Sequence, residues 1–157
     1  KYLPIVHKVY EEKFSLQITG RSPADFICKL VAKAPNITLV PNPEDISDTI
    51  KGCGIFICPT NVGGGIKLRI MDGLRLGMPG LTHKVSARGY ECFIGMPWFQ
   101  VYETEKEFES GLKLIIDEIM KESGTLREDI VKAYYSSFSF ISGAERLEQI
   151  FNSYEVG

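Results

Sequence analysis

Apolar positions along the chain follow two patterns that alternate. Short runs of mostly apolar residues predict five strands, at residues 16–19, 37–40, 54–58, 80–82 and 99–102. Between these runs, apolar residues recur three or four positions apart, which is the spacing of an amphipathic helix. Strands that alternate with helices are typical of a parallel sheet with crossover connections. The pattern therefore predicts an α/β fold, a Rossmann-like parallel sheet flanked by helices, with the unbroken apolar run at 54–58 as a central strand buried on both faces.

Each predicted helix has an apolar face that is expected to pack on the sheet. The first helix is expected over residues 2–13, with Leu3, Val6 and Tyr10 on one face. Four further helices have apolar faces at helical spacing: Phe26, Ile27, Leu30 and Val31; Ile46 and Ile50; Ile66, Ile70, Met71 and Leu74; Phe108, Leu112, Ile115, Ile116 and Ile119. Two amphipathic helices then form a helical C-terminal segment, 125–157, of a single domain spanning 1–157.

Capping residues predict where these helices begin and end. Ser22 and Pro23 predict an N-cap and a first helical residue, and Pro43 is expected to open the next helix. Gly77, followed by Pro79, is placed to end the helix over 66–76. Three pairs have the capping-box spacing before a helix: Thr104 with Glu107, Thr125 with Glu128, and Ser142 with Glu145.

Composition and charge exclude several classes of protein. The 157 residues include 18 Lys and Arg against 20 Asp and Glu, for a formal net charge of −2, so nucleic acid is not an expected partner. No apolar run approaches the ~18 residues that span a bilayer, and no signal-peptide pattern opens the chain. With 44% hydrophobic and 24% charged residues, the composition is that of a globular domain.

Cysteine and histidine usage argues against a metal site. The four cysteines lie among apolar neighbours at spacings unlike those of a zinc site or a CxxC motif: Cys28, Cys53, Cys58 and Cys92. They are expected to be buried free thiols in a reducing cytoplasm. His7 and His83 are too few for a histidine-rich metal site, and no Asp-x-Asp motif is present. We therefore expect neither a metal nor a cofactor.

A glycine-rich segment follows the third predicted strand. Gly63, Gly64 and Gly65 precede a helix, so backbone N–H groups there can approach an anion that the helix N-terminus also favours. Lys67 and Arg69 add positive charge where a diphosphate would lie. The alternative is a flexible turn with basic surface residues. The segment matches neither the Walker A pattern nor the GxGxxG dinucleotide pattern.

Other polar residues lie near strand ends, where open α/β sheets bind ligands. Arg21 ends the first strand, and Asp72 lies on the helix five residues after Lys67. A carboxylate accepts two hydrogen bonds from a ribose diol, although Asp72 is equally consistent with a surface residue. His83 is interpreted as a structural hydrogen-bonding residue or a cleft residue, and Arg88 as an acceptor contact or a surface charge.

The run from Gly63 to Pro79, GGGIKLRIMDGLRLGMP, resembles the donor-site signature of GT-B glycosyltransferases. It is most similar to the group 1 retaining family in its variant G-x-G-x-[KR]-x-K-[IL]-x-E-A-[ML]-x-x-G-x-P. The order of elements also matches, with a strand ending in Gly-Arg, an acidic turn and helix, and an apolar strand ending in Pro. The resemblance covers most of the chain, from Tyr2 to about Tyr154.

The resemblance implies roles for individual residues. Asp72 takes the place of the second Glu of the family's E-x7-E motif, which binds the ribose hydroxyls, and the first Glu falls on Gly64, as in the glycine-rich branch. The diphosphate would be neutralised by cationic side chains and met by backbone donors of the glycines: Lys67, Arg69, Arg21, and Gly63 to Gly65. The base would be cradled by backbone groups of one turn: Val40, Pro41 and Asn42.

By this resemblance the chain is the donor-binding, C-terminal half of a GT-B enzyme. The whole enzyme would transfer a sugar from a UDP- or GDP-type nucleotide-diphospho-sugar to an acceptor, with retention of configuration, in bacterial surface polysaccharide synthesis. The chain begins with Lys1 and would lack the N-terminal acceptor domain, its expected partner, so it would bind the donor without transferring the sugar. We assign no catalytic residue within it.

The expected location is cytoplasmic, and the resemblance also allows peripheral attachment of the full enzyme to the inner face of the membrane. Two other classes stay open. One is a non-catalytic module that binds a nucleotide or nucleotide-sugar. The other is a different α/β enzyme, such as a dehydrogenase or a phosphosugar isomerase, although the missing GxGxxG pattern argues against a dehydrogenase.

Overall fold

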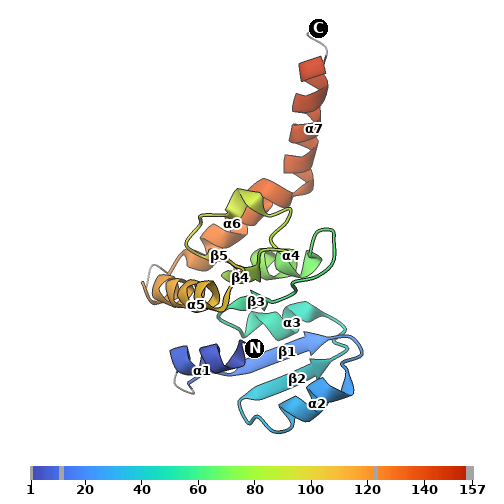
Figure 1. Cartoon of the computed structure of the whole chain (residues 1–157). Helices are drawn as coiled ribbons and strands as arrows, with labels where there is room; N and C mark the ends of the chain where they lie inside the picture. Colours follow the sequence, from blue (N-terminus) through green and yellow to red (C-terminus); the bar gives the residue numbers. More distant parts are fainter. Residues whose placement is uncertain (1, 11–12, 122–123, 155–157) are drawn as a thin grey trace.

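The computed structural model describes residues 2–10, 13–121 and 124–154 (Figure 1). Its helices and strands alternate along most of the chain: α1 (Leu3–Tyr10), β1 (Leu16–Gly20), α2 (Asp25–Val31), β2 (Ile37–Pro41), α3 (Ile46–Lys51), β3 (Phe56–Cys58), α4 (Leu68–Arg75), β4 (Gly80–His83), the 3-10 helix η1 (Glu91–Phe93), β5 (Phe99–Tyr102), α5 (Glu105–Met120), α6 (Leu126–Phe138) and α7 (Phe140–Tyr154). Each of the five predicted strands is present, within two residues of its expected ends.

The strands form two parallel sheets, one of β1 and β2 and one of β3, β4 and β5. In the first sheet, Leu16 lies opposite Ile37. In the second, Gly80 of β4 lies opposite Phe56 of β3 on one side and Phe99 of β5 on the other. All strand pairs are parallel and helices connect the strands, so the predicted α/β, Rossmann-like architecture is confirmed.

The central strand of the larger sheet is β4, and the prediction that 54–58 forms the buried central strand is wrong. All four residues of β4 are buried, whereas in β3 only Cys58 is buried and Phe56 and Ile57 are half-buried. The reason lies in the pairing, because β4 has a strand on each side and β3 is an edge of its three-stranded sheet. An apolar run records burial but not the position of a strand within a sheet.

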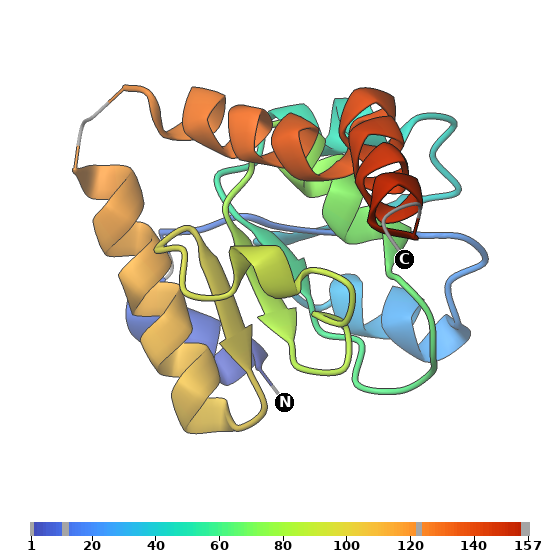
Figure 2. The same cartoon turned by 90° about the horizontal axis from the view of Figure 1, so that it is seen from above.

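Two apolar clusters cover the two faces of this sheet. One cluster combines strand residues with residues of α4, η1 and α6: Cys58, Ile70, Leu74, Tyr90, Phe93, Trp98, Phe99 and Ile130. The other combines strand residues with residues of α1 and α5: Val6, Leu81, Tyr102, Phe108, Leu112 and Ile115. Figure 2 shows the same arrangement, with α1 and α5 on one side of the strands and α4 and α6 on the other. The core of the described chain therefore lies around β4.

Helix α2 does not bury its predicted apolar face. Phe26 is 69% exposed and Leu30 is 50% exposed, and only Ile27 and Val31 are half-buried. The physical reason is that α2 packs beside a sheet of two strands, which offers a single short helix only a narrow apolar surface. Ile66 and Ile119, which were also expected on packed faces, are exposed at the ends of their segments.

Two of the predicted caps form as expected. Gly77 has a φ of +71°, its N–H donates to the Leu74 carbonyl, and the Met78 N–H donates to the Gly73 carbonyl, which is the Schellman motif. At the start of α5, the hydroxyl of Thr104 accepts from the Glu107 N–H, and the Glu107 carboxylate accepts from the Thr104 N–H. In both cases every bonding partner lies within a few residues of the cap.

The cap predictions at Ser22 and Pro43 are wrong. Helix α2 begins at Asp25 after Ala24, because Ser22 has a φ of +46° and its N–H donates to the side chain of Asn42. Asp45 caps α3 instead of Pro43, and its carboxylate accepts from the Ser47 N–H.

The two other predicted capping boxes are also wrong. Thr125 occupies the N-cap position of α6, but its side chain donates to Asp129 and does not cap the helix. Ser142 lies inside α7, where its N–H donates to the hydroxyl of Ser139.

The first and last helices and the cysteines differ in part from the predictions. Helix α1 ends at Tyr10, and the predicted helix over 2–13 includes residues 11–12, which lie outside the described part. Helix α7 projects from the rest of the described chain, and residues 155–157 of the predicted C-terminal segment are not described (Figure 1). Cys58 is buried as expected, but Cys28 and Cys92 are exposed, because they lie on the outer surfaces of α2 and η1.

The contact between α4 and α6 can be tested at Gly77. A Cβ at this position would lie 2.6 Å from the carbonyl oxygen of Arg127 in α6. Gly124 offers a matched control, because its φ of +64° is similar and nothing lies within 4 Å of its added Cβ. We expect Gly124→Ala to lower the free energy of unfolding by about 1–2 kcal/mol from backbone strain, and Gly77→Ala to lower it by at least about 1 kcal/mol more from the clash.

Urea denaturation of both variants measures the difference. Equal losses would contradict the close approach of α6 to the end of α4.

Candidate functional site

The glycine loop, defined here as residues 59–67, joins the carboxyl end of β3 to α4. Its glycines Gly63 and Gly65 have φ values of +92° and +72°, a region of backbone conformation that favours glycine. Helix α4 begins at Leu68, two residues later than predicted, and Lys67 is its N-cap without a capping side-chain bond. The first N–H groups of α4 therefore have no side-chain cap and lie next to the loop.

Lys67 reaches back over this loop. Its Nζ donates to the carbonyl oxygen of Gly64 at 3.0 Å, and a Cβ added at Gly63 would lie 3.4 Å from the same Nζ. The side chain is half-buried, whereas Arg69 in the first turn of α4 is exposed. The loop thus holds one ammonium group among its glycines and a guanidinium group beside it.

Asp72 lies half-buried in α4, one turn after Arg69. Its carboxylate interacts electrostatically with the hydroxyl of Tyr90, which is fully buried. Burial raises the pKa of the Tyr90 hydroxyl, the Met71 backbone lowers it, and the negative charge of Asp72 raises it further. Asp72 is therefore close enough to Tyr90 to influence the protonation of its hydroxyl.

The turns after β1 and β2 are joined to each other. The Ser22 N–H donates to Oδ1 of Asn42 at 2.9 Å, and the Asn42 N–H donates to the Gly20 carbonyl at 2.9 Å. Asn42 itself has a φ of +50°. These bonds bring exposed Arg21 beside the turn of Val40, Pro41 and Asn42.

The predicted site residues therefore form two groups. Arg21 lies beside Val40–Asn42 at the end of the smaller sheet. The three glycines lie with Lys67, Arg69 and Asp72 at the end of the larger sheet. Figures 1 and 2 show the turn after β1 and the glycine loop on the same side of the molecule. Parallel strands account for this, because each segment follows the carboxyl end of its strand.

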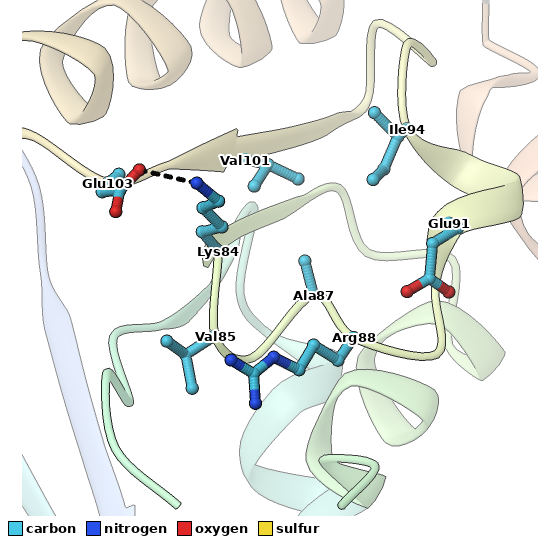
Figure 3. A pocket seen from close by; sticks show the side chains of 8 residues that line it. All are labelled: Lys84, Val85, Ala87, Arg88, Glu91, Ile94, Val101 and Glu103. Carbon is cyan, nitrogen blue, oxygen red and sulfur yellow. Dashed lines mark hydrogen bonds and ion pairs between the residues drawn. The ribbon is translucent and has the colours of Figure 1, made fainter. Parts of the chain in front are cut away.

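A hollow of about 420 Å³, called here the β4–β5 hollow, lies beyond the ends of these two strands. Figure 3 shows its lining residues: Lys84, Val85, Ala87, Arg88, Glu91, Ile94, Val101 and Glu103. Lys84 is paired with Glu103 at 2.9 Å, and the Glu91 carboxylate accepts from the Gly89 N–H at 3.0 Å. That bond lowers the pKa of Glu91. Arg88 lies exposed at the hollow, which leaves both predictions for it open.

His83 is buried at the end of β4. Its Nδ1 accepts from the Val85 N–H at 3.1 Å, and its ring meets the ring of Tyr102 edge-on with 5.4 Å between the centroids. This is the geometry of a structural hydrogen-bonding residue.

Two further residues, Ser86 and Tyr90, contact the glycine loop, although no sequence motif points to them. The hydroxyl of Ser86 donates to the Thr60 carbonyl at 2.6 Å, and that of Tyr90 donates to the Lys67 carbonyl at 2.8 Å. Their position just after the fourth predicted strand was the one sequence feature that could have indicated them. A hydrogen bond from a hydroxyl to a carbonyl 23 or 26 positions away produces no recognisable pattern in the sequence.

Within 2–10, 13–121 and 124–154, no three His, Cys, Asp or Glu side chains gather in an arrangement for a metal ion. In the same part of the chain, no helix is both long enough and apolar enough to cross a membrane.

Comparison with known proteins gives a match at the level of fold. No family model matches the chain, and no curated protein matches it. Among solved structures, the chain is similar to the pneumococcal O-GlcNAc transferase GtfA, crystallised in complex with UDP and GlcNAc, with a TM-score of 0.64 and 16% sequence identity. The match covers 96% of this chain and 31% of that one, so the chain spans about a third of the length of the enzyme it resembles. At this identity the likeness shows a shared glycosyltransferase-like fold.

The link between the turns that follow β1 and β2 can be tested at Asn42. Asn42→Gly keeps the positive φ available but removes the Oδ1 acceptor for the Ser22 N–H. We expect hydrogen exchange at the Ser22 amide to become about three to ten times faster, the usual effect of losing one hydrogen bond. The Leu16 amide, bonded to the Asn36 carbonyl at the other end of β1, is the internal control and should keep its rate. An unchanged Ser22 rate would contradict the link.

Proposed function

We propose that this chain binds the nucleotide-diphospho-sugar donor of a glycosyltransferase. The observation that carries the proposal is the glycine loop, with two glycines at positive φ and the Nζ of Lys67 held 3.0 Å from the Gly64 carbonyl, directly before α4. Such a loop presents backbone N–H groups, a helix N-terminus and a cation at one point, which is the chemistry that binds a diphosphate.

In this proposal the diphosphate lies against Gly63, Gly64 and Gly65. On binding, Lys67 exchanges a neutral carbonyl partner for a charged phosphate oxygen, which makes a stronger hydrogen bond. Arg69 adds a second cation from α4, and Arg21 adds a third from the turn after β1. These cations and the helix N-terminus stabilise the negative charge that develops on the leaving diphosphate, so no metal or cofactor is included in the proposed site.

The ribose and the base of the nucleoside would be bound by two different sets of residues. We assign the ribose hydroxyls to Asp72, whose carboxylate accepts two hydrogen bonds from a diol. We assign the base to Val40, Pro41 and Asn42, where half-buried Val40 offers an apolar contact and the turn offers backbone groups. The proximity of Arg21 to this turn supports a single ligand whose diphosphate contacts Arg21 and whose base contacts Val40–Asn42.

The activity of the whole enzyme is also part of the proposal. The solved transferase with the same fold is about three times as long, which supports a larger enzyme that includes another domain. We propose that such an N-terminal domain supplies the acceptor site, and that the whole enzyme is a retaining, GT-B, group 1 glycosyltransferase of bacterial surface polysaccharide synthesis. Its proposed location is the cytoplasm, with peripheral contact at the inner face of the membrane.

Calorimetric titration of the chain with UDP, GDP, uridine and guanosine, in the presence of EDTA, tests the diphosphate assignment. We expect Lys67→Ala to weaken binding of the preferred diphosphate about 10- to 100-fold, because one charge-assisted hydrogen bond is lost, and to leave nucleoside binding nearly unchanged. Lys106→Ala, which removes an exposed lysine from α5, is the matched control and should match the wild type.

Equal losses for the diphosphate and the nucleoside would remove Lys67 from the diphosphate site. If the wild-type chain binds neither UDP nor GDP, the proposed function is wrong. Binding that disappears in EDTA would instead require a metal.

The ribose assignment is tested with 2′-deoxy ligands. We expect Asp72→Asn to weaken binding of the ribonucleoside diphosphate about three- to ten-fold, and to reduce the preference over its 2′-deoxy analogue by a similar factor, because one of the two acceptor oxygens and the negative charge are lost. Asp117→Asn, an exposed change on α5, is the control. An unchanged preference between ribose and deoxyribose would remove Asp72 from the ribose site.

A further inference from the structure

The segment that follows β4 contacts the glycine loop at both of its ends. The hydroxyl of Ser86 donates to the Thr60 carbonyl at 2.6 Å, near the start of the loop. The hydroxyl of Tyr90 donates to the Lys67 carbonyl at 2.8 Å, at its last residue. Ser86 and Tyr90 are both 0% exposed, and the accepting residues Thr60 and Lys67 are half-buried.

A third contact lies between these two bonds. Gly89 packs against Ile66 so closely that a Cβ at Gly89 would lie 2.9 Å from Cγ1 of Ile66. Its φ of +86° also favours glycine. Ser86, Gly89 and Tyr90 are called the brace below, and together they touch the loop at Thr60, Ile66 and Lys67.

The brace is itself fixed by the core. The N–H groups of Ser86 and Ala87 donate to the His83 carbonyl, and the Tyr90 N–H donates to the Ala87 carbonyl, so the segment forms consecutive tight turns. The Tyr90 ring packs against Phe138 of α6, with 5.5 Å between ring centroids. The brace therefore holds a defined position relative to β4 and α6.

Within the loop, the Nζ of Lys67 donates to the Gly64 carbonyl, and the glycine segment itself is open to solvent. Residues 61–66 are all exposed, and a Cβ added at Gly64 or Gly65 would meet nothing within 4 Å. A run of three glycines is also the most flexible kind of backbone. The brace binds the carbonyls on either side of the glycines, and at Lys67 it adds to the helix bond from the Ile70 N–H, which donates to the same carbonyl at 2.9 Å.

We infer that Ser86 and Tyr90 are positioning residues for the diphosphate site, which hold the glycine loop in the conformation that meets the diphosphate. The inference rests on the proposed function for its ligand, but the support of the loop is a property of the free chain. Because Lys67 is held through its carbonyl, Tyr90 also fixes the start of the side chain that reaches the phosphates. A loop ordered in advance loses less entropy on binding, so the brace raises affinity for the part of the ligand that the loop touches.

The first test uses the free chain. Tyr90→Phe and Ser86→Ala each remove one hydroxyl, and Tyr134→Phe and Ser136→Ala remove matching hydroxyls from α6. NMR relaxation of the Gly63, Gly64 and Gly65 amides is measured in each variant. We expect order parameters of these three amides to fall toward about 0.6 or below, the flexible range, in both brace variants and to match the wild type in both controls.

The β4 amides serve as a reference within each variant. If they loosen together with the loop, the change is global and the inference is wrong. Unchanged glycine amides in both brace variants would also overturn it.

The second test measures affinity for UDP or GDP and for the matching nucleoside. We expect each brace variant to bind the diphosphate about three- to ten-fold more weakly, the effect of one hydrogen bond, and to bind the nucleoside as the wild type does. The double variant should lose less than the product of the two single effects, because a loop released at one end has less order left to lose.

The outcomes separate the two ideas. A wild-type chain that binds no diphosphate would overturn the proposed function, and the relaxation data would still decide whether the brace holds the loop. A loop that loosens without any loss of diphosphate affinity would overturn the inference and leave the proposed function standing.

Discussion

The burial of β4 between two apolar layers is the constraint on which the rest of the structure depends. All four of its residues are buried, and Gly80 and Leu81 show how tightly they are enclosed. A Cβ at Gly80 would lie 3.2 Å from the ring of Phe99, and a Cβ at Gly111 of α5 would lie 3.0 Å from Cδ1 of Leu81. Its neighbour β5 adds an aromatic ring to each cluster, Phe99 to one and Tyr102 to the other. An interior packed this closely cannot easily be compressed, so β4 has a fixed position and the segment that follows it begins at a fixed position too.

The candidate site uses that fixed point. The segment after β4 turns at His83 and returns along the glycine loop, where Ser86 and Tyr90 hold the loop by its carbonyls. The loop contributes glycines, N–H groups and the ammonium of Lys67, whereas the rigid support comes from residues with no ligand role in the proposal. This division explains how an exposed, glycine-rich segment has a defined shape. The smaller sheet is arranged differently, because its two turns support each other through Asn42.

Local sequence was a reliable guide where the bonding partners are local. Gly77 and the pair Thr104 and Glu107 form the predicted caps, because each needs only neighbours within one turn. The same reasoning failed at Ser22, whose N–H is bonded to a side chain 20 positions away. It also failed for Phe26, since helical spacing indicates an apolar face but not whether a surface exists to cover it. Lys67 and the three glycines were found from sequence because cations and positive-φ glycines are properties of single residues, and the ligand roles assigned to them remain predictions.

The sequence by itself determined the α/β class, the strands and the glycine-rich loop with its cations, because periodicity and residue type record burial and backbone freedom position by position. Only the tertiary structure decided that β4 is the central strand, that Arg21 lies beside Asn42, and that Tyr90 and Ser86 hold the glycine loop. Each of these depends on groups distant in sequence that meet only when the layers pack. A hydrogen bond from a buried hydroxyl to a distant carbonyl produces no periodic pattern in the sequence, since the fold determines which two groups meet.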